Sequence, residues 1–340
     1  MLATNLIPQL HAYLADPVIA ASIGLDTQEV ELSFLAQGEY NINYLLTTPY
    51  GRRVVRVNVG TQIGKPGGEQ IAYEAAALRL IEDAHVGPHL YHVDPSLERI
   101  PYGLLIMEYL PGVPLDYGNS VQIAAAAATL ARLHTIAAPA NSPFIHRRPL
   151  IDDLAEAQSW LAPYLACERA PLAVREIFEH LLEQAQIAAE RDTARFPEPF
   201  ALVHTDVQAH NFIVDTQANA LRVSLVDWER PLIDDPTYDL VHFLLPTTTR
   251  WKCGYTFTQA EQQHFLEAYC AARLDLDAAD VRERQRIRRP FILMRALGWC
   301  AGAWVDYTGP GRAINNNDTL LKIEEYLQPQ ELKELFGEWL

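Results

Sequence analysis

The most informative stretches of this chain are residues 203–211, VHTDVQAHN, and residues 225–229, LVDWE. Each stretch follows or lies within an apolar run that predicts a β-strand. Asp206 and Asn211 follow the first strand, and Asp227 lies at the end of the second. Polar side chains of this kind at strand ends indicate a site that is built for chemistry rather than for packing.

The spacing of these residues matches the layout of a kinase catalytic loop followed by a metal-binding aspartate. Phosphoryl transfer needs a carboxylate that takes or orients a hydroxyl proton, and we expect Asp206 to be that group. It also needs oxygen ligands for Mg²⁺ on the nucleotide phosphates, a role that suits Asn211 and Asp227. A lone His-x-Asp is usually a capped turn, but its combination with Asn211 and Asp227 argues against that interpretation.

The first third of the chain carries a matched pair of charges. Arg56 lies in an otherwise apolar predicted strand, where a cation needs a partner. Glu74 is three residues after Ile71 and four before Leu78, so it lies on the apolar face of its predicted helix. We therefore predict an ion pair between Arg56 and Glu74 that positions nucleotide phosphates. The alternative is two unrelated surface charges.

Two further segments are candidates for nucleotide binding. The turn between the first two strands runs from Gly38 to Asn41, and its backbone N–H groups could cover phosphates. A plain hairpin explains the same residues equally well. The backbone groups of Glu108 and Leu110, at the end of a later strand, are candidates for pairing with adenine.

The strand-rich first third and the helical remainder predict an α+β fold with two lobes, joined near residues 108–113. Residues 1–110 would form a small N-terminal nucleotide-binding lobe with a helical extension over 1–30, and residues 111–340 a larger C-terminal catalytic and substrate-binding lobe. The predicted strands are 32–35, 44–47, 54–59 and 104–109, with motif strands near 200–203 and 211–228. The predicted helices are 69–82, 119–137, 151–162, 171–191, 259–272, 279–306 and 318–327. A further helical segment, 237–245, is expected to follow Asp235 as its N-cap and Pro236 as its first residue. Asp239, in its first turn, is a candidate for a hydrogen bond to the catalytic loop.

Composition excludes several classes of partner. The chain has 43 acidic and 27 basic residues, so its net charge is −16, which argues against nucleic acid and anionic membrane as partners. The four cysteines form no C-x-x-C pair and fit free thiols in a reducing compartment. The N-terminus has no signal-peptide pattern, and no apolar run approaches the roughly 18 residues of a membrane span. We expect a cytoplasmic protein.

These features together resemble the aminoglycoside phosphotransferase/choline kinase-like family, which has a two-lobed protein-kinase-like fold. The resemblance runs from about residue 30 to about residue 327. The motifs that carry it are His204-Thr205-Asp206 with Asn211, Val226-Asp227-Trp228-Glu229, Asp235-Pro236 with Asp239, Gly38 with Asn41 and Tyr44, Arg56, Glu74, residues 107–112 and residues 130–134. Three residues depart from the usual pattern. Gln208 stands where the family usually has His or another polar residue, and Tyr40 stands where it often has Ser. Arg56 stands where kinases usually have Lys, although this family sometimes has Arg there.

The resemblance implies ATP-dependent phosphorylation of a hydroxyl on a small molecule, with ATP and Mg²⁺ as cofactors. It makes Asp206 the catalytic base, Asn211 and Asp227 the Mg²⁺ ligands, and Arg56 the strand cation with Glu74 as its partner. Adenine would lie against the backbone of residues 107–110. Amino sugars, choline-like amines, homoserine-like metabolites and modified sugars are all compatible acceptors.

Two other classes of function compete with this interpretation. A metal-dependent hydrolase could use His204, Asp206, His210 and Asp227 as ligands for Zn²⁺ or Mn²⁺, although it would leave the Arg56–Glu74 pair without a role. A nucleotide-binding regulator without turnover is the third possibility. Tightly bound zinc would favour the hydrolase, and binding of Mg-ATP without any product would favour the regulator.

One late helix suggests an amine-bearing acceptor. Trp299 and Asp306 are seven residues apart on the predicted helix 279–306 and therefore share a face. An aromatic face and a carboxylate together suit a cation. The alternative is that Trp299 is a core residue and Asp306 a surface charge at the helix end.

Overall fold

The computed structural model of the chain describes residues 2–25, 30–38, 40–61, 63–139, 141–217, 221–309 and 317–340. The chain folds into two compact units. The N-terminal unit comprises Met1–Leu115, Ala138–Phe144 and His210–Pro231, and the C-terminal unit comprises Asp116–Ala137, Ile145–Ala209 and Leu232–Leu340. The units are discontinuous in sequence, whereas the expected lobes, divided at residues 110 and 111, were continuous. The functions expected of those lobes stay predictions.

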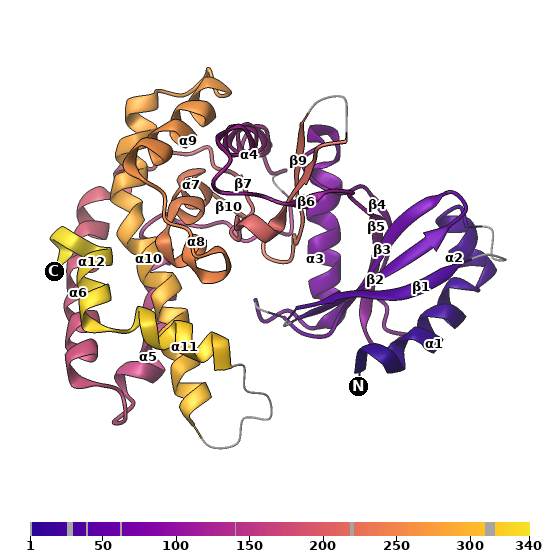
Figure 1. The fold of residues 1–340 in the computed structure, drawn as a ribbon, viewed down its shortest axis with the longest axis horizontal. Helices are drawn as coiled ribbons and strands as arrows, with labels where there is room; N and C mark the ends of the chain where they lie inside the picture. Colours follow the sequence, from indigo (N-terminus) through magenta and orange to yellow (C-terminus); the bar gives the residue numbers. More distant parts are fainter. Residues whose placement is uncertain are drawn as a thin grey trace. The chain divides into compact units, whose positions relative to one another are not determined.

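A five-stranded antiparallel sheet in the order β1-β2-β3-β5-β4 forms the centre of the N-terminal unit (Figure 1). Its strands are β1 (Glu31–Gln37), β2 (Asn41–Thr48), β3 (Gly51–Asn58), β4 (Leu90–Asp94) and β5 (Gly103–Glu108). The sequence predicted all of them except β4. That edge strand is at most half-buried along its whole length, so it lacks the apolar alternation that marks a strand in sequence.

Helices cover both faces of this sheet. In the expected helical extension, α1 (Leu2–Leu14) and α2 (Pro17–Ser22) are present and share a buried apolar cluster with Val55 and Val57 of β3. Arg56 points to the opposite face because side chains alternate along a strand. On that face α3 (Gly67–Leu80) packs closely, since a Cβ at Gly103 would lie 2.6 Å from an Ile71 methyl group.

A small antiparallel sheet completes the N-terminal unit. It has the order β6-β8-β9, from β6 (Val113–Pro114), β8 (Phe212–Asp215) and β9 (Arg222–Leu225). The loop after α3 is packed against it, because Leu225 N donates to Val86 O at 2.7 Å. A Cβ at Gly87 would lie 2.9 Å from Trp228 Nε1, so only glycine fits there. This contact fixes the segment that carries Asp227.

The C-terminal unit is helical, and within it α10 packs against both α5 and α7 (Figure 1). Its helices are α4 (Ser120–Leu133), α5 (Ile151–Leu165), α6 (Leu172–Asp192), α7 (Thr237–Leu244), α8 (Pro246–Cys253), α9 (Gln259–Ala271), α10 (Ala278–Thr308), α11 (Asn317–Tyr326) and α12 (Pro329–Phe336). Two short strands, β7 (Ala201–Val203) and β10 (Leu232–Asp234), pair antiparallel. None of the helices in the described ranges is long and apolar enough to cross a bilayer.

The predicted helices of this unit are present, with three differences. The helix predicted over 119–137 ends at Leu133, because His134 turns inward to bond Tyr269 and Asp239. The short helices α8 and α12 were not predicted. Each has only eight residues and starts at a proline, Pro246 or Pro329, which is as typical of a turn as of a helix start.

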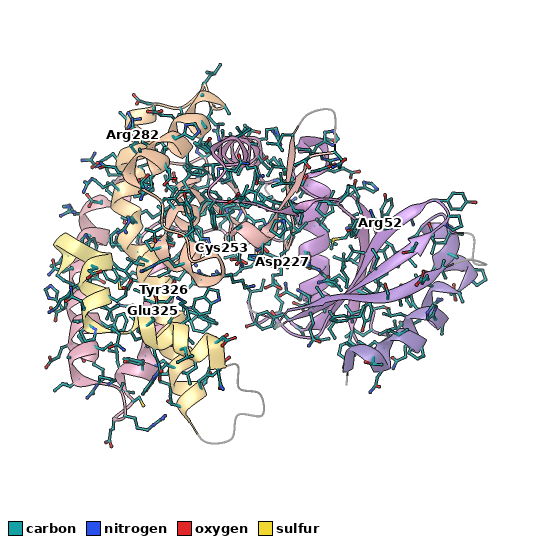
Figure 2. All side chains as sticks on the ribbon, viewed as in Figure 1. Arg52, Asp227, Cys253, Arg282, Glu325 and Tyr326 are labelled. Carbon is teal, nitrogen blue, oxygen red and sulfur yellow. The ribbon has the colours of Figure 1, made fainter. Side chains whose placement is uncertain are left out.

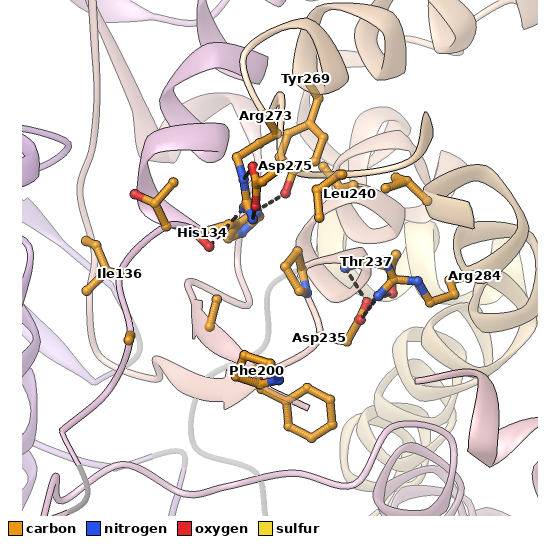
Figure 3. A pocket seen from close by; sticks show the side chains of 17 residues that line it. His134, Ile136, Phe200, Asp235, Thr237, Leu240, Tyr269, Arg273, Asp275 and Arg284 are labelled. Carbon is orange, nitrogen blue, oxygen red and sulfur yellow. Dashed lines mark hydrogen bonds and ion pairs between the residues drawn. The ribbon is translucent and has the colours of Figure 1, made fainter. Parts of the chain in front are cut away.

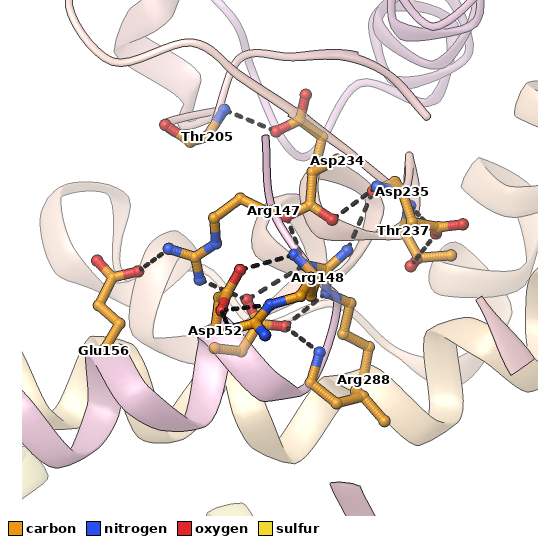
Figure 4. A network of polar contacts seen from close by, with 12 residues as sticks. Arg147, Arg148, Asp152, Glu156, Thr205, Asp234, Asp235, Thr237 and Arg288 are labelled. Carbon is orange, nitrogen blue, oxygen red and sulfur yellow. Dashed lines mark hydrogen bonds and ion pairs between the residues drawn. The ribbon is translucent and has the colours of Figure 1, made fainter. Parts of the chain in front are cut away.

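A buried ionic network fixes the approach to α7 (Figure 4). Arg288 on α10 is fully buried and bonds the carboxylates of Asp153 at 2.9 Å and Asp234 at 2.7 Å. It also donates to the backbone carbonyl of Asp235 at 3.1 Å. The Asp235 side chain accepts from Thr237 N at 2.9 Å and so holds the start of α7, although the helix begins one residue later than predicted, with Pro236 rather than Asp235 as its N-cap residue. Through these bonds α5, α10 and β10 set the position of α7.

Candidate active site

The stretch 203–211 begins as a loop whose backbone is held by a buried carboxylate. Asp239 of α7 accepts hydrogen bonds from the N–H groups of His204 and Thr205, both at 2.8 Å. Thr205 has a φ of 72°, in the left-handed region that non-glycine residues rarely adopt. The two bonds stabilise this strained turn just before Asp206, and the expected contact of Asp239 with the loop is confirmed.

Asp239 is itself fixed by His134. His134 Nε2 lies 3.1 Å from Asp239 Oδ2, and its Nδ1 lies 3.0 Å from the hydroxyl of Tyr269. Burial alone would raise the pKa of Asp239, but the bond from His134 and the nearby donors outweigh it and lower that pKa. Asp239 therefore stays ionised. We call Asp239, His134 and Tyr269 the loop brace.

A pocket of about 280 Å³ in the C-terminal unit reaches the loop brace (Figure 3). His134 and Tyr269 contribute to its wall, together with Arg273, which donates to the His134 carbonyl at 2.9 Å. Phe200 and Leu240 line the apolar part. Arg273 also forms an ion pair with Asp275 at 2.7 Å.

Asp206 has a partner that the sequence did not predict. Gln208 donates its side-chain amide to Asp206 Oδ2 at 3.0 Å, so this departure from the family pattern still serves the loop. The hydroxyl of Tyr117 accepts from Ala209 N at 2.9 Å and holds the next turn of the loop. The first bond orients the carboxylate that we expect to act as the base, and the second holds the backbone of the loop that follows it.

His242 is a second neighbour of Asp206 that sequence reasoning missed. It is buried on α7, three residues after Asp239 and so on the same face. Burial lowers the pKa of His242 to about 4, although the charges of Asp206 and Asp239 act to raise it. Its Nδ1 has no hydrogen-bond partner within the described ranges. Its imidazole is therefore neutral at neutral pH.

The N-terminal unit contains the predicted ion pair and adds a third charge to it. Arg56 Nη1 lies 2.5 Å from Glu74 Oε1 and 2.8 Å from Asp227 Oδ1. Its Nε donates to the side chain of Asn43 at 3.0 Å. Burial acts to lower the pKa of Arg56, but the carboxylates of Glu74 and Asp227 raise it. Arg56 is therefore a permanent cation that holds Asp227 in place.

The two carboxylates around Arg56 differ in exposure. The Glu74 side chain is 1% exposed, and burial raises its pKa to about 7 despite the adjacent Arg56. Asp227, which is labelled in Figure 2, has a side chain that is 34% exposed, so part of it faces solvent. Glu74 is thus the structural partner of Arg56, and Asp227 is the one that a ligand can reach.

A hairpin brings Asn211 and Asp227 to the same place. Phe212 of β8 pairs with Leu225 of β9, and Val226 N donates to Asn211 O at 2.9 Å. The next residue, Asp227, has a left-handed φ of 74°. The two candidate metal ligands therefore lie at one end of the same hairpin, within the N-terminal unit.

The other two candidate nucleotide segments are also placed. Gly38 N donates to Asn41 O at 2.9 Å, which closes the turn between β1 and β2; Glu39 lies outside the described residues. At the end of β5, Glu108 N donates to His89 O at 2.8 Å, so this N–H is already used within the sheet. The guanidinium of Arg52 lies 4.2 Å from the ring centre of Tyr109 and supports the segment that leads to Leu110. Adenine binding there stays a prediction.

A family model described as the phosphotransferase enzyme family (APH) matches residues 31–288. The chain belongs to this family. It is a small-molecule kinase, and the predicted resemblance is confirmed. No match is found among curated protein sequences.

Solved structures of other kinases share the fold. A putative aminoglycoside phosphotransferase from Ralstonia eutropha has a TM-score of 0.64 at 15% identity, with 96% of each chain covered. A choline kinase from Cryptosporidium parvum has a TM-score of 0.63 at 14% identity, with 96% of each chain covered. A Plasmodium vivax ethanolamine kinase has a TM-score of 0.63 at 15% identity, covering 89% of this chain and 83% of its own. The predicted two-lobed α+β fold is thereby confirmed.

The residues considered for a hydrolase are divided between the units of this phosphotransferase. His204 and Asp206 belong to the C-terminal unit, and His210 and Asp227 to the N-terminal unit. Over the ranges that the structure describes, no three side chains of His, Cys, Asp or Glu gather as a metal site. The ion pair of Arg56 with Glu74 is present, and a hydrolase would give it no role.

The acceptor candidates lie along α10. Trp299 is half-buried and makes an edge contact with Trp251 at 5.7 Å between ring centres. Asp306 is exposed. A cation, Arg250, already lies 5.5 Å from the ring of Tyr326, which stacks on Trp251. The role of Trp299 and Asp306 in acceptor binding stays a prediction.

The ion pair predicts non-additive losses of turnover. Arg56→Met and Glu74→Gln should each reduce kcat/KM, and the double variant should lose little more, because either change releases Asp227. The coupling energy of such a cycle should be about 0.5–3 kcal/mol. Steady-state kinetics on the four proteins measure it. Glu69→Gln and Arg79→Met, which change exposed charges on the same helix, are the matched controls; additive losses would show that Arg56 and Glu74 act separately.

Proposed function

We propose that this phosphotransferase transfers the γ-phosphate of ATP to a hydroxyl group of a small, amine-bearing molecule. The observation that carries the proposal is the contact of Arg56 with both Glu74 and Asp227. Burying a guanidinium without a partner is destabilising. Here Glu74 and Asp227 both pair with it, and the Asp227 carboxylate remains accessible to a ligand. That arrangement suits the binding and orientation of phosphates, and it has no purpose in a hydrolase.

Asp206 is the proposed catalytic base. As the acceptor oxygen forms its bond to the γ-phosphorus, the bond from that phosphorus to the β,γ-bridging oxygen breaks and ADP leaves. The hydroxyl proton passes to the Asp206 carboxylate, which the Gln208 amide orients at 3.0 Å. The loop brace keeps this loop in one conformation before substrates arrive, so binding need not supply that order.

Asn211 and Asp227 are the proposed Mg²⁺ ligands. An amide oxygen and a carboxylate at one end of the β8–β9 hairpin are the hard donors that Mg²⁺ prefers. Arg56 occupies Oδ1 of Asp227 and fixes the orientation of that carboxylate. When bound, the ion would offset negative charge on the nucleotide phosphates.

The amine on the acceptor is the finer part of the proposal. The chain carries a net charge of −16, which favours cationic ligands in general. Two structures that share its fold are described as choline and ethanolamine kinases, whose named substrates are amino alcohols. Trp299 and Asp306 are the proposed recognition residues on α10.

Removal of the base should abolish most of the turnover. Asp206→Asn keeps the size of the side chain but loses its proton affinity, so kcat should fall by roughly 10²–10⁴-fold. ATP affinity should change little. A coupled assay of ADP release, with the mass of the phosphorylated product confirmed, measures kcat. Calorimetry measures the affinity for ATP. Turnover near that of the wild type would exclude Asp206 as the base.

Removal of the metal ligand should affect binding as well as turnover. Asp227→Ala should abolish activity and remove the Mg²⁺ dependence of ATP binding, because it takes away a carboxylate ligand. Calorimetry with and without Mg²⁺ tests this. Asp215→Ala is the matched control, since Asp215 lies on the same hairpin and accepts a hydrogen bond from Gln217 N. If Asp227→Ala binds Mg-ATP like the wild type, other residues hold the ion.

The charge of the acceptor can be tested with matched compounds. Choline should be phosphorylated with a higher kcat/KM than its neutral isostere, in which a quaternary carbon replaces the nitrogen. Asp306→Asn should raise KM for choline and leave KM for the isostere unchanged. A screen in which neutral or anionic alcohols are preferred would contradict the amine and leave the kinase assignment intact.

A further inference from the structure

Asn41, at the start of β2, is held from both ends of its side-chain amide. Its Nδ2 donates to Glu229 Oε2 at 2.6 Å, and its Oδ1 accepts from Asn58 Nδ2 at 3.0 Å. Asn41 and Asn58 face each other in the β2–β3 register, and both are buried. Because both ends of the amide are used, this side chain is a structural tie rather than a group waiting for phosphate.

Asn58 extends the tie to the backbone on both sides of the turn. Its Nδ2 also donates to Gly60 O at 2.7 Å, and Val59 N donates to Tyr40 O at 2.8 Å. The turn between β1 and β2, which we expect to cover phosphates, is therefore fastened at its base. Asn41 also connects this turn to a segment that is distant in sequence, through its bond to Glu229.

Glu229 is held a second time through its backbone. Gln70 on α3 donates its amide to Glu229 O at 2.7 Å and accepts from Thr61 Oγ1 at 2.7 Å. Gln70 and Glu74 are four residues apart, so they share one face of α3. Gln70 fixes Glu229 directly. Glu74 pairs with Arg56, and Arg56 in turn pairs with Asp227. The segment after β9 is thus joined to α3 at two points, one turn apart.

We propose that Glu229 is a positioning residue that couples the β1–β2 turn to the segment of Asp227 through its bond to Asn41. The inference rests on the proposed function, in which Asp227 holds Mg²⁺ on the nucleotide, and on the expectation that the turn covers the nucleotide phosphates. The bond from an amide to a carboxylate is stronger than one between neutral groups, so it suits a fixed tie.

Exchanging the amide of Asn41 and the carboxylate of Glu229 tests whether Glu229 acts through its hydrogen bond to Asn41 or through its negative charge alone. Asn41→Asp places a carboxylate against Glu229 and should raise the Kd and the KM for Mg-ATP by roughly tenfold, the scale of one lost charged hydrogen bond. Adding Glu229→Gln restores one donor and one acceptor with their places exchanged, and the double variant should recover most of the lost affinity. Each change should affect kcat much less than KM for ATP.

Two further variants keep the test decisive. Glu229→Ala and Asn41→Ala should each weaken Mg-ATP binding, and together they should lose little more than either alone. Thermal unfolding of every variant separates lost affinity from lost stability. If Glu229→Gln fails to rescue Asn41→Asp, or if the alanine losses are additive, the tie is not what Glu229 provides. Failure of the wild type itself to bind Mg-ATP would instead overturn the proposed function.

Discussion

The buried guanidinium of Arg56 is the constraint on which the N-terminal unit depends. An unpaired charge at this depth would cost several kcal/mol, so the fold must supply carboxylates to it. It supplies Glu74 from α3 and Asp227 from the segment after β9. Three elements that are distant in sequence are thereby held at one point. The same requirement that stabilises the unit also places Asp227 where part of its carboxylate remains accessible.

The C-terminal unit solves a similar problem with the opposite charge. There a buried carboxylate, Asp239, accepts two backbone N–H groups and a bond from His134. In each unit a buried charge lies beside a residue with left-handed φ, Thr205 or Asp227. A strained backbone conformation persists only where surrounding contacts hold it in place. A buried ion pair supplies such a contact, because separating it would leave a buried charge without a partner. Rigidity of the chemical groups is thus built into each unit separately.

The ties around Glu229 show that polar networks need not be catalytic to matter. Asn41, Asn58 and Gln70 are buried amides, and each would be costly without partners. Asn41 and Gln70 bond Glu229, and Asn58 bonds Asn41 and the backbone of Gly60. These bonds offset the cost of burying the amides and fix the geometry of the segments that carry them. The turn, α3 and the Asp227 segment are therefore expected to respond together to nucleotide, rather than as independent loops.

Periodicity and motif spacing were enough to predict the class of fold, the ion pair of Arg56 with Glu74 and the bond of Asp239 to the loop. A charge at a position that periodicity marks as buried must be paired, and the local pattern reveals this. Only the tertiary structure decided that Asp227 joins the pair, that Gln208 orients Asp206 and that Asn41 meets Glu229, 188 residues away. Amide hydrogen bonds have no periodicity, and their partners are set by how distant elements pack. The edge strand β4 was missed for a related reason, because its half-exposed side chains carry no alternation that a sequence could display.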